Sequence, residues 1–140
     1  MKRKVLLISI VGIIALSVVT AWAGPKMNPG KWEITTKTTM AGMPAQSITH
    51  IQCITKEDLI PVNQDANQGC QVTDIVYDGN TVSWKISCGA QSGGMKGTGK
   101  VTYNGDSMQG TMHMIMSGSD MQINNQFQGR RIGPCDSSER

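Results

Sequence analysis

The sequence predicts an all-β fold: an antiparallel curved sheet, or a partly closed barrel, of about seven strands with one short helix. Short runs rich in Thr, Val, Ile and Met are separated by Gly, Asn and Asp, which favour turns between strands. Two of these turns share the pattern Tyr-Asx-Gly, at residues 77–79 and 103–105. Asx-Gly between alternating segments is the strongest local hairpin signal, so two antiparallel hairpins are expected.

The first 23 residues are a predicted secretory signal peptide. A basic start at residues 2–4 precedes an apolar run at residues 5–19, and the segment ends in Ala-Trp-Ala at residues 21–23. The apolar run is shorter than the ~20 residues that a membrane-spanning helix needs. We therefore expect cleavage after Ala23 and an exported, soluble product with no membrane span.

Residues 24–135 are expected to form a single β domain, followed by a polar tail at residues 136–140. The predicted strands cover, in order, residues 31–40, 47–53, 70–77, 81–88, 95–103, 107–116 and 121–130. Residues 55–59, Thr-Lys-Glu-Asp-Leu, combine an N-cap residue with acidic residues in the first turn. This pattern predicts the short helix, which Pro61 would end.

Hydrophobic alternation predicts the registers of the two hairpins. In the second hairpin, a two-residue turn at residues 104–105 gathers the apolar side chains on one face and puts Val101 opposite Met108. The first hairpin gathers its apolar residues on one face only with an odd-length loop, centred on Gly79, or with a β-bulge. The sequence leaves these two solutions open.

The four cysteines all follow the signal peptide, so they enter an oxidising compartment in which disulfides persist. Four cysteines allow three pairings. The first hairpin places Cys70 opposite Cys88, within disulfide reach. If segment 54–69 crosses the full height of the sheet, Cys53 and Cys135 share the opposite end. We therefore predict the bridges Cys70–Cys88 and Cys53–Cys135.

The net charge of the chain after the predicted signal peptide excludes one class of partner. The formal net charge of +3 comes from the basic residues of the signal peptide, because the rest of the chain has equal numbers of basic and acidic residues. The mature chain therefore lacks the basic surface that nucleic-acid binding needs, and no nucleic-acid partner is expected.

The sequence contains no catalytic constellation, so we expect neither enzyme activity nor a cofactor. His50 and His113 each lie mid-strand on the more polar face, which favours a surface or half-buried imidazole over a catalytic one. No Cys-x-x-Cys spacing suggests zinc. The Gly-Thr-Gly at residues 97–99 lacks the setting of a phosphate-binding loop and indicates close strand packing or a bulge.

Methionine is the unusual component of the predicted core, with ten in the chain. Alternate methionines on one strand fit a core face, because thioethers fill irregular cores. Such a flexible face can also accept an apolar molecule. The predicted ligand-lining residues are Trp32, Trp84, Met108, Met112 and Met114. Thioethers also bind Cu(I), and the alternative is a copper site formed by Met108, Met112, Met114 and Met116.

Several strings carry a family resemblance. They are Pro-Gly-Lys-Trp-Glu at 29–33, Gln-Cys-Ile-Thr-Lys-Glu-Asp-Leu at 52–59, Gly-Asn-Thr-Val-Ser-Trp at 79–84, Gly-Thr-Gly at 97–99, Tyr-Asn-Gly-Asp-Ser at 103–107 and Gly-Arg-Arg-Ile-Gly-Pro-Cys at 129–135. In this order they resemble the exported bacterial domain-of-unknown-function family 3617 (DUF3617), over nearly all of the mature chain. The resemblance implies a periplasmic or secreted bacterial location. It implies no activity and no catalytic residue.

The function expected from the sequence is therefore binding without catalysis. The ligand would be a small apolar molecule or an envelope protein. The alternative is a periplasmic protein that handles Cu(I) through methionine side chains.

Overall fold

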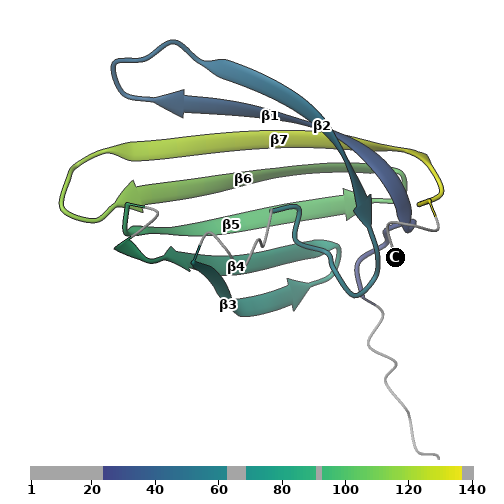
Figure 1. The fold of residues 1–140 in the computed structure, drawn as a ribbon. Coiled ribbons are helices and arrows are strands. Elements are labelled where there is room, and N and C mark those ends of the chain that lie inside the picture. The colour runs from purple at the N-terminus through teal and green to yellow at the C-terminus, as the bar shows by residue number, and fades with distance from the viewer. Residues whose placement is uncertain (1–23, 63–68, 91–92, 137–140) are drawn as a thin grey trace, which may run out of the picture.

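The structure, a computed structural model, describes residues 24–62, 69–90 and 93–136; the predicted signal peptide and the end of the polar tail lie outside the described residues. Seven antiparallel strands form one open sheet in the order β2-β1-β7-β6-β5-β4-β3 (Figure 1). The strands are β1 (Gly30–Met40), β2 (Gln46–Ile54), β3 (Cys70–Asp78), β4 (Thr81–Cys88), β5 (Met95–Asn104), β6 (Ser107–Met116) and β7 (Gln122–Gly133). The predicted all-β curved sheet is confirmed, and it does not close into a barrel. No helix in the described ranges is long and apolar enough to span a membrane.

The short helix predicted at residues 55–59 is wrong, because this segment forms bends and the described ranges contain no α-helix. The expected capping bond is nevertheless present: the backbone N–H of Asp58 donates to Oγ1 of Thr55, at 3.3 Å. The chain does not continue as a helix because Leu59 and Ile60 turn into the core, where both are buried. Burial of these two side chains outweighs the local capping signal.

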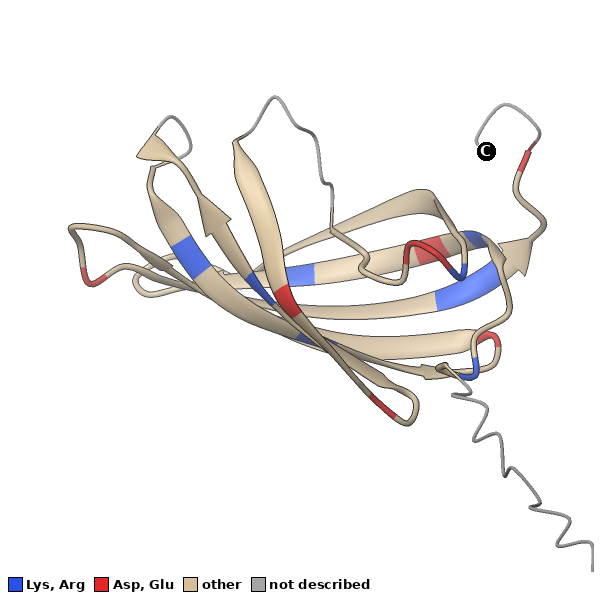
Figure 2. Ribbon diagram, turned by 90° about the horizontal axis from the view of Figure 1, so that it is seen from below, with Lys and Arg blue, Asp and Glu red and all other residues tan. Residues whose placement is uncertain are grey.

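The connection from β2 to β3 crosses the whole sheet, since these strands are its two edges. Strand β2 ends at Ile54, opposite Gly30 at the start of β1, whereas β3 begins at Cys70, opposite Cys88 at the end of β4. The connection therefore also runs from one end of the strands to the other, as the disulfide prediction requires. Its described part, residues 55–62, which we name the crossing segment, lies in the trough of the curved sheet (Figure 2). We name the covered side the core face and the other side the outer face.

Glycines bring the strands of the core face close to its large side chains. Three large side chains each lie across from a glycine of the neighbouring strand: Trp84 from Gly99, Phe127 from Gly110 and Met108 from Gly129. A Cβ atom at any of these glycines would overlap the side chain opposite. The Gly-Thr-Gly string is thus a site of close strand packing, one of the two readings predicted for it.

The second hairpin turns one residue later than predicted. Its loop is residues 105–106 instead of 104–105, and the first loop residue is a glycine with a φ of 65°, which suits a type II′ turn. Met108 therefore faces Tyr103 and not Val101. The change of register amounts to two residues, so the same side chains stay on the core face.

The first hairpin contains a β-bulge, which is one of the two solutions that the sequence allowed. Its loop is residues 79–80, and the register shifts around Asp74, whose φ is 51°. The bulge adds one residue to β3, so a two-residue loop at one end is compatible with Cys70 opposite Cys88 at the other.

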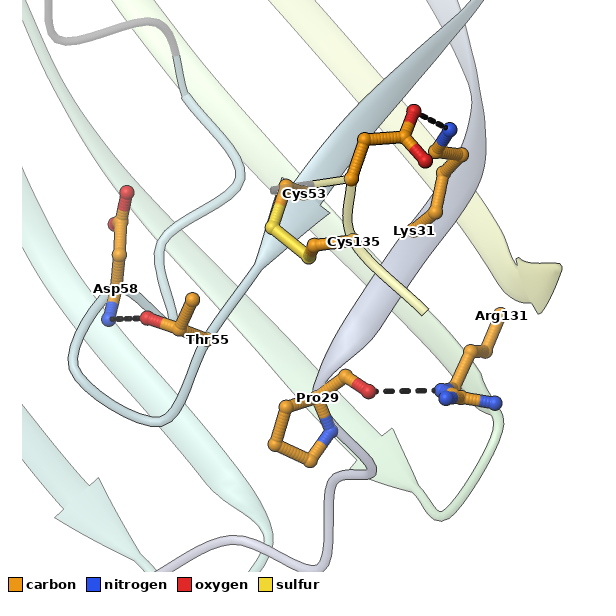
Figure 3. Close-up of a disulfide and its surroundings, with 8 residues drawn as sticks. Pro29, Lys31, Cys53, Thr55, Asp58, Arg131 and Cys135 are labelled. Atoms are coloured by element: carbon orange, nitrogen blue, oxygen red, sulfur yellow. Dashed lines mark hydrogen bonds and ion pairs between the residues drawn. A yellow bond between two sulfur atoms is a disulfide. The ribbon is translucent and has the colours of Figure 1, made fainter. Parts of the chain in front are cut away.

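A disulfide lies at each end of the sheet. Cys53–Cys135 joins the end of β2 to the chain after β7 (Figure 3), with the two Cα atoms 5.6 Å apart. Cys70–Cys88 joins β3 to β4 at the opposite end, with a Cα separation of 3.9 Å. These are the two pairings that strand direction predicts.

Candidate functional site at one end of the core face

The two ends of the core face differ in chemistry. We name the end near Cys53–Cys135 the aromatic end and the end near Cys70–Cys88 the methionine end. Trp32 and Tyr103, at the aromatic end, are both 0% exposed. Their rings meet edge to face, with centroids 5.9 Å apart and an interplanar angle of 80°. This end is filled by its own side chains.

The crossing segment is bound to the aromatic end by a buried hydrogen bond. The hydroxyl of Tyr103 donates to the backbone carbonyl of Leu59, at 2.6 Å. Burial raises the pKa of the Tyr103 hydroxyl above its ordinary value, and the negative charge of Asp58 adds to the increase. The segment therefore covers the aromatic end as a fixed layer.

The segment before β1 closes the same end from another side. Met27 is 5% exposed, and Nε of Arg131 donates to the carbonyl of Pro29 at 2.8 Å (Figure 3). The neighbouring Arg130 forms an ion pair with Glu33, also at 2.8 Å. Both arginines of the Arg-Arg pair therefore have structural partners.

The methionine end is only half covered. Its apolar side chains are half-buried: Met40, Met95, Met112, Met114, Met116 and Ile123. They form neighbouring rows across the sheet, because Met116 lies opposite Met95 and Ile123 lies between Met114 and Met40. The rows make a continuous apolar surface of flexible thioethers.

One buried polar pair separates the two ends. Asn125 is 8% exposed and accepts a hydrogen bond at Oδ1 from the hydroxyl of Thr38, at 2.7 Å. Asn125 lies opposite Met112 in the register of β6 and β7. The pair therefore places a polar group at the boundary of the methionine end, on an otherwise apolar part of the core face.

The predicted ligand-lining residues fall on both sides of this boundary. Trp32, Trp84 and Met108 are buried in the core, whereas Met112 and Met114 are half-buried at the methionine end. A ligand could reach the first three only by displacing the layer over them. Lining by Met112 and Met114 stays a prediction that needs no such movement.

The residues of the copper alternative are also divided. Met108 packs against Gly129 under the covering layer, while Met112, Met114 and Met116 follow one another along the methionine end. Sequence reasoning missed Met95, which lies directly across from Met116. Its place becomes visible only through the register of β5 and β6, which the Gly-containing turn determines.

Trp84 has a buried polar atom next to this site that lacks a hydrogen-bond partner in the described part of the chain. Its indole Nε1 is buried and has no hydrogen-bond partner within the described residues, as is also true of Trp32. The Trp84 ring lies over Gly99, and the next residue in that row is Met112. An unpaired buried N–H costs roughly 1–3 kcal/mol, so this position favours a hydrogen-bond acceptor.

The two histidines do not meet. His113 is half-buried on the outer face, and His50 is exposed on β2. His50 borders a groove of about 610 Å³ between β2 and the crossing segment, whose other lining residues include Ile48, Asp58 and Val62. The described part of the chain holds no group of three or more His, Cys, Asp or Glu residues placed to bind a metal ion.

These features define a single-layer antiparallel β domain with one face covered by its own crossing segment and two disulfides. The chain belongs to the family described as protein of unknown function (DUF3617), whose model matches residues 27–135. The family predicted from the sequence is thereby confirmed. No curated protein and no solved structure matches the chain.

Proposed function

We propose that this protein is a non-catalytic binding protein of the periplasm or the extracellular space, whose ligand is a small apolar molecule held at the methionine end of the core face. Two disulfides support an oxidising compartment. The observation that carries the proposal is the contrast along β6: Met108 is 4% exposed, whereas Met112, Met114 and Met116 are only partly buried on the same face.

The chemistry of the methionine end suits an apolar ligand with one polar group. Thioether side chains are flexible and polarisable, so they adapt to ligands of different shape. The pair of Thr38 and Asn125 places one polar group at the inner border of the site, beside Met112. Binding sites of this kind are mostly apolar with few polar groups.

A neutral fluorescent probe, N-phenyl-1-naphthylamine, tests this proposal. We expect saturable binding that Met114→Gln weakens by roughly tenfold, because the substitution puts an amide into an apolar site. Ile115→Gln is the matched control, since Ile115 is the next residue on β6 and lies exposed on the outer face. Absence of saturable binding, or an equal loss in the control, would contradict the proposal.

Copper is the second candidate, and one observation favours it. Met116 lies opposite Met95, and Met114 is the next core-face residue on β6, so three thioethers come from two paired strands. Competition with a coloured Cu(I) chelator tests this function. Tight Cu(I) binding that disappears in Met114→Leu and Met116→Leu would support it, since these swaps nearly conserve side-chain volume.

An envelope protein is the alternative occupant, and the edge strand β2 is the surface suited to it. Ile48 and Ile51 are 66% and 57% exposed there, beside the groove next to the crossing segment. Replacing Ile51 with Lys should weaken such a partner without affecting probe binding at the methionine end. Loss of both activities would show that the two sites are not separate.

A further inference from the structure

On the outer face, four basic side chains surround one threonine. Thr98 on β5 lies opposite Lys85 on β4 and opposite His113 on β6. Lys96 and Lys100 are its nearest same-face neighbours along β5. Directly opposite residues have Cβ atoms about 4.5–5.5 Å apart, and same-face neighbours on one strand are about 7 Å apart. The register therefore places four nitrogen-bearing side chains around a single hydroxyl.

The surface is hollowed at this position. One groove of about 570 Å³ is lined by Lys85, Lys100, Thr98 and His113 among others, and a second of about 390 Å³ by Lys96, Thr98 and His113 among others. The two grooves share Thr98 and His113, so they meet at the centre of the basic group. Their volumes lie within the range of roughly 300–1,000 Å³ found for small-molecule sites.

The local sequence explains why the grooves form. Short hydroxyl residues alternate with long basic ones in this part of the sheet: Ser83 lies opposite Lys100, which lies opposite Thr111. Short side chains provide a floor with hydroxyl groups, and lysines form the walls. We name the group of Lys85, Lys96, Thr98, Lys100 and His113 the basic cradle.

The positive charge of the cradle is only partly compensated. Lys85 forms an ion pair with Asp74, at 2.9 Å. Lys96 and Lys100 have no ion pair within the described ranges, although the chain after the signal peptide is neutral overall. The cradle therefore concentrates two uncompensated positive charges around hydroxyl groups.

His113 is held in place from the neighbouring strand. Its Nδ1 lies 2.7 Å from Oδ1 of Asn124, and because an amide oxygen only accepts, Nδ1 is the donor. This bond orients the imidazole beside Thr98. One wall of the cradle is thus fixed, whereas the lysine walls are flexible.

We propose that the basic cradle binds a phosphate monoester. Two uncompensated ammonium groups match a doubly charged anion better than a single carboxylate, and the hydroxyl of Thr98 supplies a neutral donor at the centre. The rest of the ligand would lie along the groove toward Ile115, which is 46% exposed. This site lies on the opposite face from the methionine end and does not depend on the function proposed for it.

Titration of the ¹⁵N-labelled mature protein with glucose 6-phosphate at low ionic strength tests the assignment. We expect saturable amide shifts centred on Thr98 and His113, and we expect Lys100→Gln to weaken binding about five- to tenfold. Lys37→Gln is the matched control because Lys37 is another exposed lysine on the outer face, in β1. It removes the same charge and should change the affinity less than about twofold.

Two further probes separate the possible sources of the phosphate. Glucuronate has a similar sugar body with one carboxylate and should bind more weakly than glucose 6-phosphate. Vesicles of phosphatidic acid in phosphatidylcholine test a lipid-borne phosphate; retention on them that is lost in Lys100→Gln would assign the site to a lipid headgroup. The proposal fails if neither phosphate binds, if glucuronate binds equally well, or if Lys37→Gln weakens binding as much as Lys100→Gln.

Discussion

Strand β6 contributes to both ends of the core face, and its methionines have different environments at each. Met108, at the aromatic end, is 4% exposed and belongs to the same buried cluster as Leu59 and Ile60 of the crossing segment. Met112 and Met114 follow the same alternation toward the methionine end and are only half-buried. The strand pattern therefore determines which face a side chain occupies, while the covering segment determines how deeply it is buried. In a single-layer sheet these are separate questions.

The largest expected effect tests whether the aromatic end is filled by its own buried side chains. Trp32→Ala should lower the free energy of unfolding by about 3–5 kcal/mol, because it removes a fully buried ring. Met114→Ala, at the methionine end, should cost less, about 1–2 kcal/mol, since its side chain is only partly buried. Urea unfolding followed by circular dichroism measures both. Similar losses at the two positions would remove the distinction between the ends.

The two disulfides extend the comparison, because one lies at each end of the sheet. Cys53–Cys135 closes a loop with a sequence separation of 82, against 18 for Cys70–Cys88. Loop entropy in the unfolded chain then gives losses on the order of 4 kcal/mol for the first bridge and about 3 kcal/mol for the second. Replacing each pair with serine and measuring urea unfolding tests this order. A larger loss at the methionine end would show that native-state packing, not loop length, dominates.

Hydrophobic alternation and the positions of the cysteines predicted the overall architecture of the fold but not its local details. Which side chains share a face depends only on parity, so the faces of the second hairpin were correct although its turn was one residue off. The helix at residues 55–59 failed because its capping signal is local, whereas the burial of Leu59 and Ile60 depends on a distant sheet. Local sequence does not contain that information.

The candidate sites could also be predicted only in part, because local sequence does not show which residues of different strands become neighbours. Alternation along β6 indicated Met112 and Met114, but Met95 belongs to the site only through the register of two strands. The basic cradle needs two registers at once, from Lys85 across Thr98 to His113. No spacing within one strand marks these residues as neighbours, so sequence reasoning treated His113 as an isolated imidazole.

The glycines of the core face provide a smaller test, which compares how rigidly aromatic rings and methionine side chains are packed. Gly99→Ala should cost about 1–3 kcal/mol, because its Cβ would overlap the rigid Trp84 ring. Gly129→Ala should cost less, since its closest neighbour is the terminal methyl of Met108, at 2.6 Å, and a thioether can rotate away. Thermal unfolding of the two variants compares them. If Gly129→Ala is the more damaging, then Met108 is as tightly held as the aromatic rings.

The smallest effect concerns the hydroxyl that binds the crossing segment to the aromatic end. Tyr103→Phe removes the bond to the Leu59 carbonyl and should cost about 1 kcal/mol near neutral pH. Burial raises the pKa of Tyr103, so in the folded state the hydroxyl keeps its proton at pH values where the unfolded chain, with a tyrosine pKa of about 10, has lost it. The stability linked to this group is therefore complete below about pH 10 and falls as the pH rises further, by up to ~1.4 kcal/mol per unit.

Tyr103→Phe lacks this dependence, so its deficit relative to the parent should shrink above about pH 10 and vanish near pH 11. Tyr77→Phe is the control, because Tyr77 is 52% exposed on the edge strand β3. Urea unfolding at a series of pH values gives the three curves. Removing the Tyr77 hydroxyl should leave the alkaline loss of the parent unchanged, because that loss arises at the buried Tyr103 hydroxyl. A constant difference between the parent and Tyr103→Phe at every pH would mean that the hydroxyl is reached by water, and that the aromatic end is as open as the methionine end.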